Sequence, residues 1–211
     1  MANYRVIDAD GHVRESNAGM REFLPPRWQR RNLFPNDEWD RDLRGKLGQK
    51  PEGPKDQLAA MDEDGIDVMV MYPTAGLHVS ALHEKDYATA VTQAYNDWLY
   101  HFCKTDAARL KFVALLAPQD PNAAAEELRR AVTERGAVAG VLPTYLPQMP
   151  DFGDGFYDPI YAAAESLGVG LGFHTGTSAD SLGGQRFRKF LSAHTIDHPA
   201  EQMMALIATI V

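Results

Sequence analysis

Short apolar runs alternate along most of the chain with longer stretches of helical periodicity. The apolar runs predict five strands, over residues 6–12, 66–72, 111–116, 138–142 and 169–173. Each run is apolar on both faces, which is typical of parallel strands covered by helices. The pattern therefore predicts an α/β fold.

The stretches between the strands carry helix signals. Asp120 followed by Pro121 gives an N-cap and a proline in the first turn, and residues 84–105 show one apolar stripe at i, i+3, i+4 spacing. Helices are predicted over 56–64, 84–105, 121–136 and 160–167. A last helix is expected to begin near His198 and Pro199, because proline suits the first turn.

Residues 13–55 show neither helical nor strand periodicity and contain five prolines. Embedded aromatic residues, among them Trp28 and Trp39, indicate that this segment packs against the rest of the chain. We interpret 13–55 as a lid-like loop after the first strand. The whole chain, 1–211, is expected to form one domain.

The first strand ends in Asp-Ala-Asp-Gly-His, where alternation places Asp8, Asp10 and His12 on one face. A carboxylate two residues before a histidine suits a divalent metal, and Gly11 leaves room for close approach. The alternative is that the two aspartates begin a turn and His12 caps a loop. His174 ends the fifth predicted strand. If all three residues bind one ion, the ligand atoms of Asp10, His12 and His174 should lie within about 5 Å of one another.

Two architectures fit five buried strands: an open doubly wound sheet and a (β/α)₈ barrel. The doubly wound sheet usually has a glycine-rich phosphate loop after its first strand, and Asp-Gly-His-Val-Arg-Glu is not one. A barrel instead places its chemistry at the carboxyl ends of several strands, where Asp10, His12 and His174 are expected.

The composition of the chain limits the classes of partner that the protein is expected to bind. The formal net charge of −8 and the absence of long basic runs argue against nucleic acid and against an anionic membrane surface. A small-molecule partner is favoured. No apolar run is long enough to span a bilayer, and the amino-terminal residues do not resemble a secretory signal, so we expect a cytoplasmic protein. The single cysteine, Cys103, lies in a helical pattern and is interpreted as a packed thiol.

Several motifs resemble one known family. They are Ile-Asp-Ala-Asp-Gly-His near the start, Tyr-Pro-Thr after the second strand, Tyr-Asn-Asp-Trp-Leu in the long helix and Gly-Phe-His-Thr-Gly at the fifth strand. Together they resemble the amidohydrolase-related proteins (amidohydrolase 2). The branch that they resemble most is that of the aminocarboxymuconate-semialdehyde decarboxylases.

The resemblance implies a (β/α)₈ barrel of the TIM type with one divalent metal, whose ligands map to Asp10, His12 and His174. It also implies a histidine after a sixth strand and an acid–base aspartate after an eighth, which would lie beyond Val211. Such a barrel needs about 250 residues. We therefore expect a barrel truncated after the fifth strand–helix unit, with its catalytic acid–base residue unassigned.

The expected function is that of a metal-dependent hydrolase or non-oxidative decarboxylase. Its substrate would be a small carboxylic acid, or an amide or ester, and its metal zinc, with manganese second. The alternative is a catalytically incompetent α/β fragment that acts only through another chain, and we expect a homo-oligomer. His194 and His198 are not expected to share a helical metal-binding face, because Pro199 should begin the helix.

Overall fold

The computed structural model describes residues 4–31, 33–34, 52–176 and 182–210. The strands are β1 (Ile7–His12), β2 (Val68–Tyr72), β3 (Leu110–Leu115), β4 (Ala139–Pro143) and β5 (Gly170–His174). The helices are α1 (Asn17–Arg21), α3 (Pro54–Asp64), α4 (Lys85–Cys103), α5 (Pro121–Arg135), α6 (Asp158–Leu167), α7 (Leu182–Arg186) and α8 (Phe190–Ala208). Three short 3₁₀ helices are η1 (Ala75–Ala81), η2 (Lys104–Asp106) and η3 (Gly155–Tyr157).

The five strands form one sheet in the order β1-β2-β3-β4-β5, and every neighbouring pair is parallel. All five lie where the apolar runs predicted them, to within two residues. Sequential order and parallel pairing require a crossover after each strand, which the intervening helices supply. The predicted α/β class is therefore confirmed.

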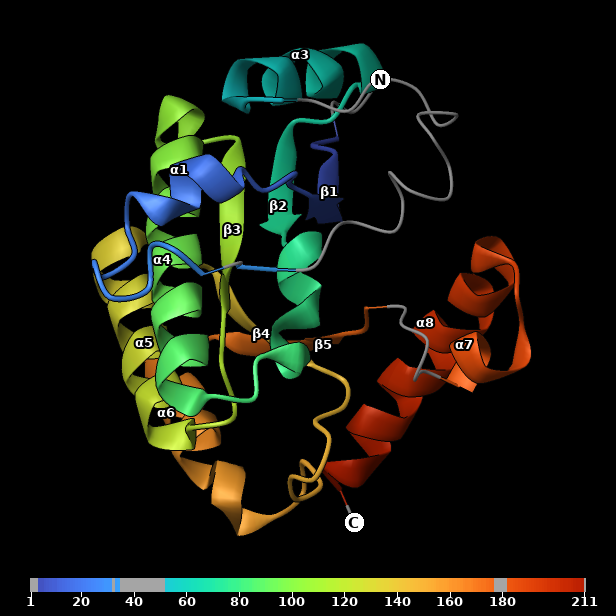
Figure 1. Ribbon diagram of the computed structural model, residues 1–211. Helices are drawn as coiled ribbons and strands as arrows, with labels where there is room; N and C mark the ends of the chain where they lie inside the picture. Colours follow the sequence, from blue (N-terminus) through green and yellow to red (C-terminus); the bar gives the residue numbers. More distant parts are fainter. Residues whose placement is uncertain (1–3, 32, 35–51, 177–181, 211) are drawn as a thin grey trace.

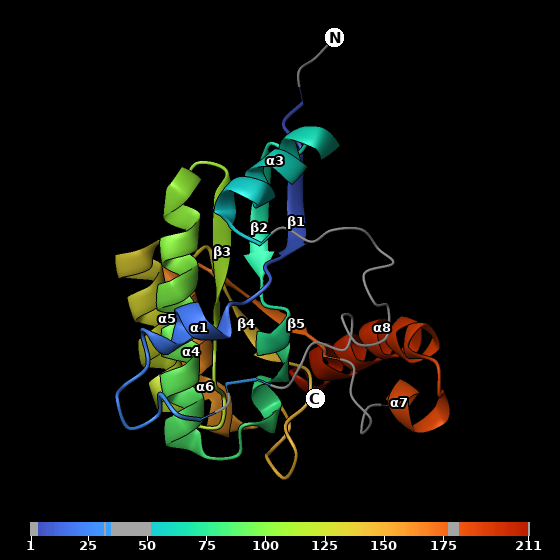
Figure 2. The same ribbon diagram turned by 45° about the horizontal axis from the view of Figure 1, so that its top comes forward.

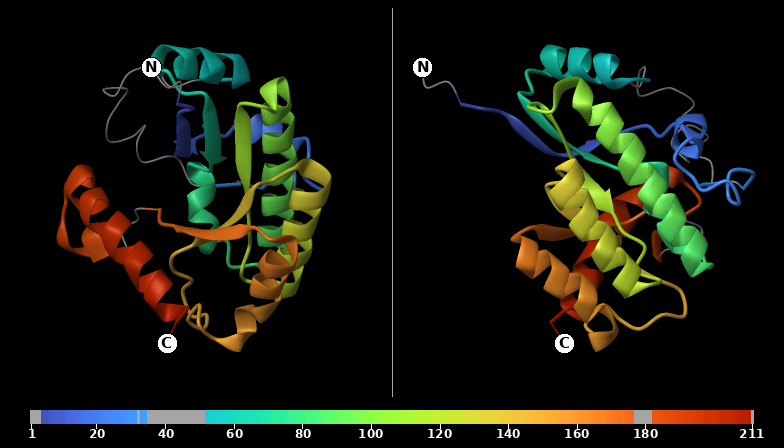
Figure 3. Two further views of the ribbon diagram at one scale, coloured as in Figure 1. Left: turned by 180° about the vertical axis from the view of Figure 1, so that it is seen from behind. Right: turned by 90° about the vertical axis from the view of Figure 1, so that its left-hand side faces the viewer.

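Helices α4, α5 and α6 lie side by side on one face of the sheet (Figures 1 and 3). Their start and stop signals act as predicted at α5, where the Asp120 carboxylate accepts the N–H of Ala123 and Gly136 ends the helix with a φ of 76°. Helices α7 and α8 lie apart from this layer, near the carboxyl end of β5 (Figure 2). Among the helices within the described ranges, none is both long and apolar enough to cross a bilayer.

The core lies between the sheet and the helices α4, α5 and α6. Tyr95 and Leu99 of α4, Leu128 of α5 and Ile160 of α6 are fully buried there. Cys103 is also buried, which confirms the packed thiol. The inner strand β3 is almost completely buried, whereas Ile7 on the edge strand β1 is 58% exposed. The two edges of the sheet are therefore its least covered part.

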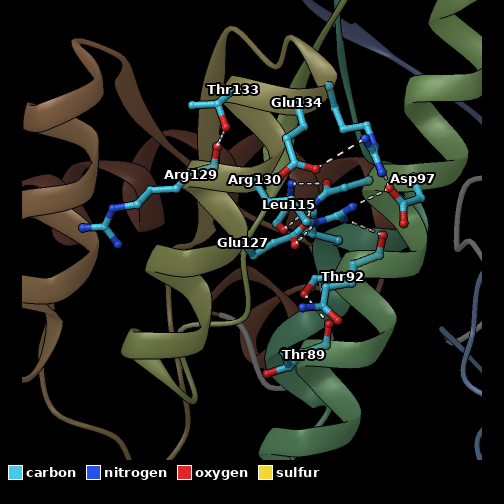
Figure 4. Close-up of polar contacts among 12 residues, drawn as sticks. Thr89, Thr92, Asp97, Leu115, Glu127, Arg129, Arg130, Thr133 and Glu134 are labelled. Atoms are coloured by element: carbon cyan, nitrogen blue, oxygen red, sulfur yellow. Dashed lines mark hydrogen bonds and ion pairs between the residues drawn. The ribbon is translucent and has the colours of Figure 1, made fainter.

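A polar brace, formed by the buried Asn96 and Glu127 and the partly buried Asp97 and Arg130, joins α4 to α5 and β3. Figure 4 shows Asp97, Glu127 and Arg130. The Asn96 amide donates to the Leu115 carbonyl at 3.1 Å and to Glu127 at 2.7 Å, and its oxygen accepts the Leu115 N–H at 2.8 Å. Strand β3 pairs with β2 only over residues 110–112. On its other side Leu115 pairs with Val141 of β4, so the Asn96 side chain takes the place of β2 at this residue.

The last helix corrects the prediction. Helix α8 begins at Phe190, two turns before the expected start near His198, and Pro199 lies inside it. The residue before it, Lys189, makes no side-chain cap, so the true start carries no sequence signal. Proline removes one helical hydrogen bond but does not end this helix.

Two smaller differences concern the segment 13–55. It contains the short helix α1, capped by the Ser16 hydroxyl, and α3 begins at Pro54 instead of Asp56. Described residues of this segment pack on α4, where Arg31 lies over the Tyr87 ring and pairs with Glu84. Residues 35–51 lie outside the described ranges, so the lid-like role stays a prediction.

Candidate metal centre

Strand β1 delivers Asp10 and His12 at its carboxyl end. The pairing of β1 with β2 shifts register between Asp8 and Gly11, and such irregularities re-aim side chains. The Asp8 carboxylate turns back and accepts the N–H of Asp10 at 3.0 Å. Asp8 is therefore absent from the ligand group described below, although alternation had placed it on the same face.

Gly11 permits β1 to lie close to β2. A Cβ atom at this position would meet the Cγ of Met69 at 2.3 Å, which is far inside van der Waals contact. A side chain here would push β1 away from Met69 and carry both flanking ligands with it. The close approach expected of Gly11 is thus explained by packing beneath the site.

The His12 ring is oriented by the loop after β2. Its Nδ1 lies 2.8 Å from the carbonyl oxygen of Pro73, and because a carbonyl only accepts, Nδ1 carries the proton. The Nε2 lone pair then points away from the loop, 3.9 Å from the Asp10 carboxylate. Burial lowers the pKa of His12, which favours the neutral imidazole that can bind a metal.

Glu15 holds the loop that orients His12. Its carboxylate accepts the backbone N–H groups of Thr74, Ala75 and Gly76 at 2.8 to 3.0 Å. These residues begin η1 directly after Pro73, so Glu15 fixes the position of the Pro73 carbonyl. Such backbone support is typical of the surroundings of metal ligands.

His174 ends β5 on the far edge of the sheet and is almost fully buried. Its Nδ1 lies 2.9 Å from the Thr175 carbonyl, so by the same argument Nε2 presents a lone pair. That Nε2 atom is 3.5 Å from the Asp10 carboxylate. When Nε2 carries a proton it donates to the Asp10 carboxylate, and this contact with His174 is the main reason that the pKa of Asp10 is lowered. In the neutral ring, an ion would take the place of that proton.

The three predicted ligands converge. One ligand atom from each of Asp10, His12 and His174 lies within 4.8 Å of the others, in agreement with the expected spacing of about 5 Å. One carboxylate oxygen and two imidazole nitrogens, each imidazole held by a carbonyl, form a donor set that suits a divalent transition metal. The residues therefore fit the metal that the sequence implied, and metal binding stays a prediction.

Tyr72 is a neighbour of the site that the sequence analysis did not select. It ends β2 in register with His12, and its ring centroid lies 6.3 Å from that of His12 and 5.8 Å from that of His174. Burial, and then the charge of Asp10, raise the pKa of its hydroxyl, which keeps it protonated. Its position at the carboxyl end of a parallel strand was the signal that could have identified it.

Two further histidines reach the site from α8. The rings of His194 and His198 have centroids 3.8 Å apart, and the His198 centroid lies 5.5 Å from that of His174. The expectation that they would not share a helical face is wrong, because α8 starts before both and includes Pro199. The imidazoles of His12, His174 and His198 therefore all interact electrostatically with Asp10, and His194 lies behind His198.

Comparison with known proteins gives concordant results. The sequence profile of the amidohydrolase family matches residues 7–210. Gamma-resorcylate decarboxylase from Rhodococcus jostii is 36% identical over 127 residues, which make up 56% of this chain and 38% of the relative. The same enzyme from Rhizobium sp. MTP-10005 is 31% identical over 127 residues, with 56% and 37% covered. The aligned residues thus make up under half the length of these relatives.

Solved structures agree with the fold. 5-Carboxyvanillate decarboxylase from Sphingomonas paucimobilis superposes with a TM-score of 0.74 at 21% identity, over 98% of this chain and 62% of that one. Dihydroxybenzoic acid decarboxylase from Polaromonas sp. JS666, with bound manganese and the inhibitor 2-nitroresorcinol, superposes with a TM-score of 0.70 at 21% identity, over 98% and 60%. The expected architecture is confirmed: the five parallel strands form half of a (β/α)₈ barrel.

Proposed function

Because this chain belongs to the amidohydrolase family, we propose that it is the metal-binding half of a carboxy-lyase that acts on a small aromatic carboxylic acid. The observation that carries the proposal is the convergence of Asp10, His12 and His174 within 4.8 Å at the carboxyl ends of β1 and β5. The relatives named as decarboxylases of aromatic acids support the choice of reaction.

The donor set of one carboxylate and two imidazoles suits both zinc, the first choice from the sequence, and manganese, the second. The Polaromonas relative binds manganese, which supports Mn²⁺ as the working ion. When bound, such an ion acts as a Lewis acid that polarises an oxygen of the substrate. Asp10, His12 and His174 would hold it.

The chain's own residues prepare the site in two ways. The Pro73 and Thr175 carbonyls fix the tautomers of His12 and His174, so both rings present Nε2 without reorganisation. The Tyr72 ring lies beside both histidine rings, and its protonated hydroxyl would be a hydrogen-bond donor for a substrate carboxylate or phenol oxygen. The Tyr72 hydroxyl and an ion held by His12 and His174 would together bind the oxygens of an aromatic acid.

The proposal is tested with the Mn²⁺-loaded protein and 2,6-dihydroxybenzoate, the ligand in a solved structure of a 2,6-dihydroxybenzoate decarboxylase. We expect metal-dependent binding of this acid by calorimetry, and release of carbon dioxide where the rest of the barrel supplies the acid–base residue. Asp10→Asn should abolish both, because the amide lacks the negative charge that a divalent ion requires. His83→Ala, which removes an exposed histidine away from the site, is the matched control. Equal binding by Asp10→Asn and the unaltered protein would contradict the proposal.

Hydrolysis of a small amide or ester is the second candidate, and the family profile itself favours it. In that case the ion would lower the pKa of a bound water towards 7. A panel that pairs each aromatic acid with its methyl ester and its primary amide separates the two reactions. Ester or amide cleavage without carbon dioxide release would replace the first candidate with the second.

A further inference from the structure

The pair His194 and His198 is the strongest metal-ligating cluster outside the group of Asp10, His12 and His174. The two residues lie one turn apart on α8, both are half-buried, and their ring centroids are 3.8 Å apart. Neither belongs to the group whose ligand atoms lie within 4.8 Å of one another. The pair is therefore a separate arrangement beside the first one.

We propose that His194 and His198 form a second transition-metal site adjacent to the first. Two histidines at i and i+4 on one helical face are a recurrent zinc-binding arrangement, because the helix presents both imidazoles to one ion. The T-shaped contact between His198 and His174 places this site directly next to the first. The proposal concerns metal binding alone and does not depend on the decarboxylation proposed above.

One buried carboxylate, that of Asp197, lies beside the pair. Asp197 is fully buried, accepts the N–H of Gly183 in α7 and interacts electrostatically with His194. Carboxylates near the ring nitrogens of ligating histidines fix their orientation and raise their basicity.

The two sites differ in the metals that they prefer. Imidazole nitrogens select zinc, copper or nickel over manganese, whereas a site with a carboxylate and two imidazoles accepts both zinc and manganese. The protein should therefore bind two zinc ions but one manganese ion. Mn²⁺ therefore reports on the first site alone, and the second Zn²⁺ ion reports on the site of His194 and His198.

The test is a metal titration of the tag-free protein after chelator treatment, by calorimetry and by metal analysis after dialysis. We expect two Zn²⁺ per chain in the unaltered protein, one in His194→Ala and in His198→Ala, and one in the double variant Asp10→Ala, His12→Ala. The exposed-histidine variant His83→Ala should keep two. With Mn²⁺, the unaltered protein and both α8 variants should bind one.

Three results would overturn the proposal. One is a single Zn²⁺ in the unaltered protein, and another is two Zn²⁺ in His194→Ala and His198→Ala. The third is loss of both Zn²⁺ ions in His198→Ala, because that residue would then belong to the first site. Circular dichroism of each variant verifies the fold, which alanine in a helix should preserve. The titration measures metal binding and not turnover of an aromatic acid. If the proposed decarboxylation is not observed, the result of the titration still stands.

Discussion

Two backbone carbonyls, those of Pro73 and Thr175, decide which nitrogen of His12 and of His174 faces Asp10. Both rings are therefore set in the ligating tautomer before an ion binds. The first coordination contacts need little rearrangement, and the free energy of binding is available to stabilise the fold.

Metal should stabilise the protein through these side chains. At a Mn²⁺ concentration of 100 times Kd, the free energy of unfolding should rise by about 2.7 kcal/mol. Asp10→Asn should lose most of this gain at the same concentration, while His83→Ala should keep it. Urea denaturation with and without Mn²⁺ measures the difference. A gain of equal size in Asp10→Asn would show that the ion binds elsewhere.

Cys103 should be almost inert in the folded protein. It is 4% exposed, and burial raises the pKa of its thiol to about 12. At pH 8 the thiolate fraction is then on the order of 10⁻⁴, so a thiol reagent should react at least about a thousand times more slowly than with a free cysteine. Because Cys103 is the only cysteine, an Ellman assay in native buffer and in guanidinium reports on it alone. Rapid reaction in native buffer would contradict the prediction.

The strand-end residues Asp10, His12 and His174 could be predicted because alternation and strand ends leave a pattern in the sequence. The position of Asp8 outside the ligand group could not be predicted, since the register shift in β1 depends on how β1 packs against Met69. Contacts between β1 and β2 determine where the Asp8 side chain lies, and the sequence of β1 alone does not reveal these contacts.

Helix α8 shows the same limit for a whole element. A strong start signal at His198 and Pro199 coincides with the middle of the helix, while the true start at Lys189 has no side-chain cap. Propensity gives only a weak prior, and contacts of α8 with α7 and β5 outweigh the hydrogen bond that proline removes. Helices α4, α5 and α6 agreed with the prediction to within two residues, because the apolar stripe that indicated each of them is also the face that packs on the sheet.

The polar brace predicts that substitution of Asn96 lowers the free energy of unfolding substantially. Asn96→Ala would leave the Leu115 N–H and carbonyl without their side-chain partner. Each buried group left unpaired costs about 1–3 kcal/mol, so the free energy of unfolding should fall by about 3 kcal/mol. Asn122→Ala, at an exposed position of α5, is the control and should change it little. Urea denaturation of both variants is the measurement, and equal stability would show that water replaces the amide.

Across the molecule, the apolar surface is distributed unevenly. Ile196, Met203 and Ile207 lie on one stripe of α8 and are 43%, 57% and 53% exposed. Soluble monomers rarely expose apolar stripes of this kind unless a partner covers them. The stripe favours the expected homo-oligomer and is the observation that supports the alternative of a chain acting through association.

We therefore predict concentration-dependent self-association. Met203→Gln together with Ile207→Gln should raise the dissociation constant about tenfold or more, because each buried apolar side chain contributes about 1.5–3 kcal/mol. Tyr145→Gln changes an exposed aromatic residue outside α8 and should leave association unchanged. Sedimentation velocity over a hundredfold range of concentration distinguishes these cases. A monomer at every concentration would refute the prediction.

Asp10 and His174 belong to the first and the last strand of the sheet, with roughly 160 residues of chain between them. An ion held by both would therefore be a reversible cross-link that closes almost the whole chain into a loop. In the chain-entropy model, a covalent link over such a loop is worth about 5 kcal/mol. Ion capture would then require a finished sheet, and chelation would release its two edges from each other without a broken peptide bond.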